Sequence, residues 1–95
     1  MNKDIADNDL GMYSAICKAG DKEVQDALRA IRDYYNSGSN FSSNLVYLIQ
    51  KSDPQNRARL RKGFPILVGL WEVCDYLGGE GMTFESFMEH FEFND

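Results

Sequence analysis

The sequence contains little of what enzymes and metal sites need. Its one histidine, His90, has no ligating residue at the helical spacings that a metal site requires, and no GxSxG, P-loop or GxGxxG motif occurs. The two cysteines, Cys17 and Cys74, lie in separate apolar segments without a CxxC spacing. We therefore expect a non-enzymatic protein with no catalytic residue, cofactor or metal. Two buried thiols are the favoured interpretation of the cysteines, and a disulfide is the alternative.

Long hydrophobic runs are also missing. No apolar segment reaches the roughly 20 residues that a membrane span needs. The first residues, MNKDIADNDLG, lack the apolar stretch of a signal peptide. The chain of 95 residues, with 43% hydrophobic and 26% charged residues, has the composition of an ordinary globular domain. We expect a single cytoplasmic domain over residues 1–95, with no membrane association.

Basic residues are absent from the last third of the chain. No Lys or Arg follows Lys62, while seven acidic residues lie between Glu72 and Asp95. The stretch 51–62 has the opposite sign, with five basic residues against Asp53 alone. If the two segments lie apart, each presents a field of one sign to a partner; if they touch, they neutralise each other.

Apolar residues recur at helical spacing along most of the chain, and no segment alternates as a half-buried strand does. Residues that commonly cap helices mark four of the expected starts: Asp21, Ser42, Asp53 and Thr83. We expect helices over residues 9–19 and 21–35, from 42 to before 53, over 53–63 and 65–77, and from 83 to about 92.

The segment from Pro65 to Leu77 is the most apolar part of the chain and contains its only tryptophan, Trp71. Pro65 favours a helix start, because the first helical position needs no backbone N–H. Apolar residues fill nearly every face of this expected helix, which is typical of a buried helix. We therefore expect an all-α fold, a compact bundle of five or six short helices around a hydrophobic central helix at about 65–77.

Thr83 is expected to cap a last helix with two different sides. Apolar residues at helical spacing form one side: Phe84, Phe87, Met88 and Phe91. Three glutamates form the other side, next to an aromatic residue at the end of the chain: Glu85, Glu89, Glu92 and Phe93. Our leading hypothesis is a small protein-binding module, accessory or inhibitor-like, that binds its partner through this acidic, aromatic-rich face. A merely solvated acidic face is the alternative.

A second hypothesis concerns the basic cluster. Arg57 and Arg61 lie four residues apart on one helix face, with Lys62 beside Arg61. Such a patch can contact phosphates, so nucleic-acid binding is the alternative function, although the net charge of −5 opposes it. In a third interpretation these arginines pair with the acidic last helix inside the fold. A homodimer through the apolar central helix is also left open.

Part of this region resembles a pattern found in small uncharacterised proteins of bacteria, phages and mobile elements. The pattern D..N...L..GFP..V is carried by Asp53, Asn56, Leu60, Gly63-Phe64-Pro65 and Val68, with Trp71 after it. It encodes a capped helix, a glycine stop and a proline restart. The resemblance implies a bacterial or phage accessory context, and it carries over no catalytic residue.

Overall fold

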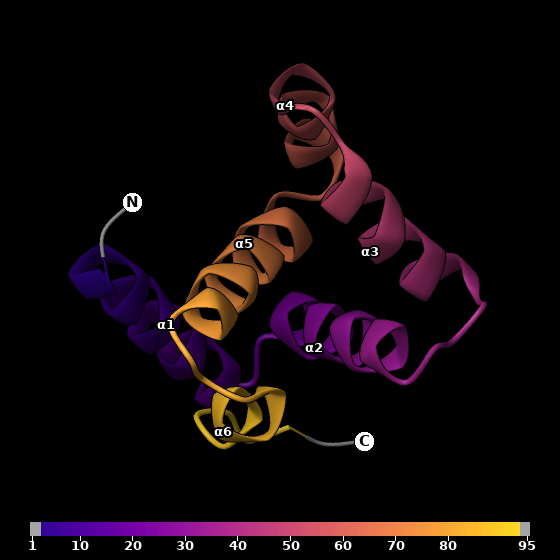
Figure 1. Ribbon diagram of the computed structural model, residues 1–95. Coiled ribbons are helices and arrows are strands. Elements are labelled where there is room, and N and C mark those ends of the chain that lie inside the picture. Colours follow the sequence, from indigo (N-terminus) through magenta and orange to yellow (C-terminus); the bar gives the residue numbers. More distant parts are fainter. Residues whose placement is uncertain (1–2, 94–95) are drawn as a thin grey trace.

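All of the regular structure that the computed structural model describes, over residues 3–93 with side chains from Asn8 onward, is helical (Figure 1). The helices are α1 (Lys3–Lys18), α2 (Lys22–Tyr35), α3 (Phe41–Lys51), α4 (Pro54–Gly63), α5 (Pro65–Gly79) and α6 (Phe84–Met88). The expected all-α bundle is therefore confirmed for the described part of the chain.

Three of the expected helix caps are confirmed. The Asp21 carboxylate accepts a hydrogen bond from the Val24 backbone N–H at 3.0 Å. The Asp53 carboxylate accepts from the Asn56 N–H of α4 at 2.8 Å. The Thr83 hydroxyl accepts from the Ser86 N–H of α6 at 3.1 Å. Each cap satisfies one of the backbone donors that the first turn of a helix leaves free.

The start of α3 differs from the expectation. Asn40 caps this helix instead of Ser42, because its side-chain oxygen accepts from the Ser43 N–H at 2.9 Å. Ser43 is itself buried and donates its hydroxyl to the Asn40 carbonyl. Phe41 consequently occupies the first helical position and is 74% exposed.

The two ends of the chain also depart from the expected boundaries. The first helix begins at Lys3 instead of Asp9. The last helix ends at Met88, so Glu89 is its C-cap, Phe91 and Glu92 lie beyond it, and of the three glutamates only Glu85 lies within the helix. Met1 and Asp95, which the expected single domain and acidic segment include, lie outside the described residues.

The central position of α5 is confirmed (Figure 1), with α1 along one side and α2 and α3 along the other. Its buried side chains are Leu67, Val68, Leu70, Trp71, Val73, Cys74 and Leu77. Trp71 is only 4% exposed, so it is a core residue. These apolar side chains are covered by the other helices of the chain.

A glycine lets α1 approach α5 closely. A Cβ atom at Gly69 would lie 2.2 Å from the Tyr13 hydroxyl oxygen, far inside van der Waals contact, and Tyr13 is buried. We therefore expect Gly69→Ala to destabilise the fold by about 1–3 kcal/mol through overpacking. The free energy of unfolding from urea titrations followed by circular dichroism measures this cost.

The same substitution in a Tyr13→Phe background is its matched control. Without the hydroxyl, the nearest ring atom lies 3.4 Å from the added Cβ, which is ordinary contact. Alanine is the better helix former by roughly 0.8–1 kcal/mol, so Gly69→Ala should become neutral or stabilising there. An equal cost in both backgrounds would show that Tyr13 is not the obstacle.

Candidate functional site

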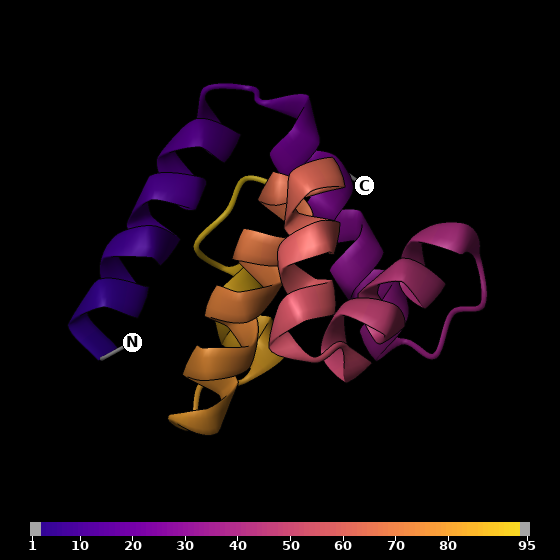
Figure 2. The same cartoon turned by 90° about the horizontal axis from the view of Figure 1, so that it is seen from above.

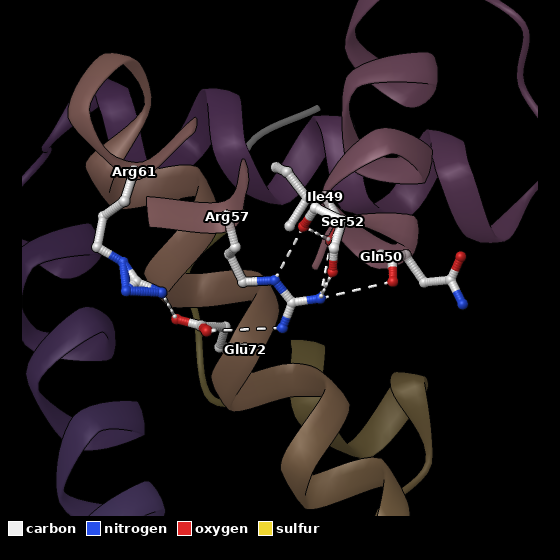
Figure 3. Close-up of polar contacts among 6 residues, drawn as sticks. All are labelled: Ile49, Gln50, Ser52, Arg57, Arg61 and Glu72. Atoms are coloured by element: carbon white, nitrogen blue, oxygen red, sulfur yellow. Dashed lines mark hydrogen bonds and ion pairs between the residues drawn. The ribbon is translucent and has the colours of Figure 1, made fainter. Parts of the chain in front are cut away.

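Arg57 lies at the junction of α3, α4 and α5 and contacts residues of α3 and α5 (Figure 3). Its guanidinium donates to the Ile49 carbonyl at 2.9 Å and to the Ser52 hydroxyl at 3.1 Å, which caps the C-terminal end of α3. The guanidinium also lies over the Trp71 ring, 5.1 Å from its centroid. Arg57 therefore holds α4 against the end of α3 and the middle of α5.

Arg57 and Arg61 both pair with Glu72 of α5 (Figure 3). The Arg61 guanidinium lies 2.6 Å from one Glu72 oxygen, and Arg57 lies 3.7 Å from the other. The predicted placement of both arginines on one helix face is confirmed. Their partner is the central helix, however, so the interpretation that they pair with the last helix is wrong.

This pairing changes the basic patch. Arg57 and Arg61 form ion pairs with Glu72, and Lys62 is an exposed cation next to them. The positive and negative segments of the sequence thus touch at Glu72, which offsets one of the two arginine charges there. The patch that a phosphate would meet is smaller than the sequence indicates.

The C-terminal segment after α6 lies against α1 and α2. Ser14 of α1 donates its hydroxyl to the His90 carbonyl. Gln25 of α2 donates its side-chain amide to the Glu92 carbonyl at 2.7 Å, and the Cys17 thiol lies 3.8 Å from the same oxygen. These bonds fix the segment where the turn-like backbone bonds that follow α6, from His90 to Phe87 and from Phe91 to Met88, come to an end.

The predicted acidic face is divided by this arrangement. The Glu85, Glu89 and Glu92 residues are exposed, as expected. Phe93 is instead half-buried beneath two arginines of α2, with the Arg32 guanidinium 5.3 Å from its ring centroid and Arg29 at 5.8 Å. The aromatic residue expected to be available to a partner therefore packs within the fold.

Cys17 and Cys74 are free, buried thiols, so the favoured interpretation of the cysteines is confirmed and the disulfide alternative is wrong. Burial raises the pKa of the Cys74 thiol to about 11. Tyr35, whose hydroxyl lies 4.0 Å from the Cys74 sulfur, has its pKa raised to about 12 by burial and by Cys74. Both groups are therefore protonated at neutral pH, and Cys74 is a poor nucleophile.

These shifts predict an alkaline loss of stability. The unfolded chain loses the Cys74 and Tyr35 protons at about pH 9 and 10, before the folded chain does. Their contribution is therefore complete below pH 9 and is lost as the pH rises through 11 to 12, by on the order of 2 kcal/mol for Cys74. Urea midpoints at pH 8, 9, 10 and 11 measure this fall.

The double variant Cys74→Ala/Tyr35→Phe is the control for the alkaline fall. Its unfolding free energy should decline less between pH 9 and 11. A residual decline is expected from Tyr13, whose pKa is also raised by burial. An undiminished decline in the double variant would assign the effect to other groups.

Helices α3 and α4 meet near Ser52 and diverge from it above α2 (Figure 2). Two hollows lie along these helices and form a groove. Its outer part is a hollow of about 390 Å³ between the start of α3, the α4–α5 junction and the middle of α2. Phe41 and Leu45 form one wall, Phe64 forms the other, and Ala27 and Ala30 form the floor. This part of the surface is mostly apolar.

A second, separate hollow of about 360 Å³ lies nearer the helix junction, between Leu48 on α3 and Leu60 on α4. Phe41, Leu45 and Leu48 follow the i, i+4, i+7 spacing that places residues on one helix face. Leu60 and Phe64 are four residues apart on the opposite wall. We call this feature, walled by these five residues, the α3–α4 groove.

The α3–α4 groove exposes apolar side chains that the fold does not cover. Phe41 is 74% and Leu48 57% exposed, and Phe64 is 39% exposed. The two ends differ in charge: Glu23 and Asp26 line the outer hollow, and Lys51 and Arg59 line the inner one. A contiguous apolar surface with a polar rim is typical of a protein-binding site.

One wall of this groove could have been predicted from the sequence if Asn40 had been chosen as the helix cap instead of Ser42. The spacing of Phe41, Leu45 and Leu48 is visible in the sequence, but with Ser42 as the cap Phe41 falls before the helix. Only the structure shows that Asn40 is the cap and that α4 diverges from α3. None of the seven residues predicted for either binding site lines the outer hollow.

The described residues contain neither a metal-binding cluster nor a helix that could cross a membrane. No three His, Cys, Asp or Glu side chains among them are close enough together to hold a metal ion. None of the described helices is both long and apolar enough to cross a membrane.

Comparisons with protein-family models, with curated proteins and with solved structures find no match to this chain. The fold and its surface define a small all-α domain with an apolar groove between two diverging helices, and its function is inferred from that geometry.

Proposed function

We propose that this protein is a small non-enzymatic module that binds another protein through the α3–α4 groove. The observation that carries the proposal is the exposure of Phe41 and Leu48 on one face of α3, opposite Phe64. Burying apolar surface in a partner releases roughly 25 cal/mol for each Å² removed from water. Large side chains left outside the core of so small a domain therefore favour a binding role.

The acidic C-terminal face is the alternative surface for the same function. Glu85 and Glu89 are exposed carboxylates that a basic partner could pair with. Exposed ion pairs contribute little by themselves, about 0–1 kcal/mol each. With Phe93 packed beneath Arg29 and Arg32, this face has less apolar surface to offer than the groove.

Nucleic-acid binding through Arg57, Arg61 and Lys62 remains a prediction with less support. Phosphate binding depends on cations that can release counterions to solvent. Glu72 already pairs with the first two of these residues and offsets one of their two charges. A nucleic acid would have to compete with that ion pair.

The proposal extends to the setting of the protein. The resemblance of residues 53–71 to bacterial, phage and mobile-element proteins supports an accessory or inhibitor-like role in such a context. Two free thiols, Cys17 and Cys74, are compatible with the reducing cytoplasm.

Affinity capture from a nuclease-treated native lysate tests the proposed function. The wild type should retain a stoichiometric protein partner, and Phe41→Ser/Leu48→Ser should lose it by tenfold or more. These residues are exposed, so the variant should unfold within about 0.5 kcal/mol of the wild type. Tyr47→Ser is the matched control, because Tyr47 is an exposed aromatic on α3 that lines a different hollow.

The variant Glu85→Lys/Glu89→Lys separates the two surfaces in the same experiment. Capture that survives this charge reversal but not the groove variant supports the α3–α4 groove. Capture lost only on charge reversal would transfer the function to the C-terminal face and refute the groove.

A further inference from the structure

We infer that the occupant of the α3–α4 groove is an amphipathic helix of the partner protein, with a basic residue at one end of its apolar stripe and an acidic residue at the other. This inference rests on the proposed function and specifies the chemistry of the partner. It follows from the shape of the groove, the spacing of its apolar side chains and the charges at its two ends.

The shape of the groove fits a helix. Its walls are themselves helices, and Phe41 and Leu48 are seven residues apart, which is about 10 Å or two helical turns. A helix laid into a hydrophobic groove uses anchors at i, i+3 or i+4, and i+7, which span the same two turns. The two hollows, of about 390 and 360 Å³, can each receive a bulky apolar side chain.

The charges at the two ends of the groove have opposite signs. At the outer end Glu23 and Asp26 line the hollow, and no Lys or Arg does. At the inner end Lys51 and Arg59 line the hollow, and no Asp or Glu does. A partner helix therefore gains from Lys or Arg beside Glu23 and from Asp or Glu beside Lys51, and a helix of the reverse polarity is repelled at both ends.

Contacts that these charged residues already make within the chain leave the two ends of the groove with opposite signs. Asp26 pairs with Arg29 on α2, and Glu23 is exposed at the same end. The Lys51 amine donates to the Tyr47 hydroxyl, and Arg59 donates to Asn56, both of which are neutral. The inner end therefore keeps its full positive charge.

A displayed library of helix-forming 16-residue peptides tests the inference. It is selected on the wild-type protein and depleted on Phe41→Ser/Leu48→Ser. The enriched peptides should share apolar residues at i, i+3 or i+4, and i+7, with a basic residue at one end and an acidic residue at the other. A synthesised peptide from this set should bind the groove variant at least tenfold more weakly.

Charge reversal in the protein checks the polarity. Glu23→Lys/Asp26→Lys should weaken that peptide roughly 3–10-fold, as expected for two exposed charge pairs. Replacing the basic residue of the peptide by Glu should restore binding to this variant. The same reversal at Glu85 and Glu89 is the control and should leave peptide affinity unchanged.

Three outcomes would overturn the inference. The first is enriched peptides without helical apolar spacing or with equal affinity for the groove variant. The second is no enrichment together with a wild-type dimer that Phe41→Ser/Leu48→Ser dissociates in sedimentation, which assigns the groove to a second copy. The third is no enrichment on a monomer. Groove-dependent capture from the lysate would leave the proposed function standing in each case, whereas groove-independent capture refutes both.

Discussion

Trp71→Ala should be the most destabilising single substitution considered for this protein, with a loss of roughly 3–5 kcal/mol in the free energy of unfolding. Trp71 is 4% exposed in the middle of α5, the helix on which most of the others pack. Truncating it removes the largest side chain of the core and leaves a cavity. It also removes the ring over which the Arg57 guanidinium lies.

Thermal and urea unfolding followed by circular dichroism measure this loss, since the variant has no tryptophan for fluorescence. For a domain of this size the midpoint should fall by roughly 4–8 °C for each kcal/mol. Leu48→Ala is the matched control, an apolar truncation at a site that is 57% exposed, and should change stability by less than about 0.5 kcal/mol. Equal effects at the two positions would mean that Trp71 is not a core residue.

Arg57→Ala should cost roughly 2–4 kcal/mol, an unusually large effect for a charged residue. The guanidinium satisfies the carbonyl of Ile49 at the end of α3, pairs with Glu72 and covers the Trp71 ring. Hydrogen bonds to charged groups are worth about 1.5–3 kcal/mol, and a cation over an aromatic ring adds about 0.5–1 kcal/mol. The side chain is 25% exposed, so water replaces only part of these contacts.

Two substitutions control for charge in this prediction. Arg59→Ala removes a neighbouring arginine that is exposed and bonds only locally to Asn56, so it should change stability by less than about 0.5 kcal/mol. Arg57→Lys keeps the charge but lacks the planar guanidinium. Its loss of stability should lie between those of Arg59→Ala and Arg57→Ala. The structural role of Arg57 is contradicted if its truncation costs no more than that of Arg59.

The sequence predicted those parts of the fold that depend on local interactions. Asp21, Asp53 and Thr83 were identified as caps because a short polar side chain before an apolar run has one dominant use. The central helix was identified because few apolar segments of its length lack a polar face. Asn40 was missed because Ser42, two residues later, is also a good capping residue, and propensity alone does not rank them.

The candidate site depends on how helices are placed, which local patterns do not encode. Nothing in the spacing of Arg57 and Arg61 distinguishes Glu72 on α5 from the glutamates of the last helix as their partner. Phe93 follows the end of α6 at Met88, and local spacing does not indicate that the chain there returns to Arg29 and Arg32 of α2. The α3–α4 groove depends on how two helices are placed, and that placement involves long-range contacts such as those of Arg57 with α3 and α5.

Site-specific photo-crosslinking in cells that naturally express the protein tests the α3–α4 groove most directly. A benzophenone side chain is placed at Phe41 in one variant, at Tyr47 in a second and at Glu89 in a third. All three positions are exposed, so each probe can reach a bound neighbour. The account predicts a crosslink to one partner protein from position 41, and none from 47 or 89. A crosslink from position 89 without one from position 41 would contradict it.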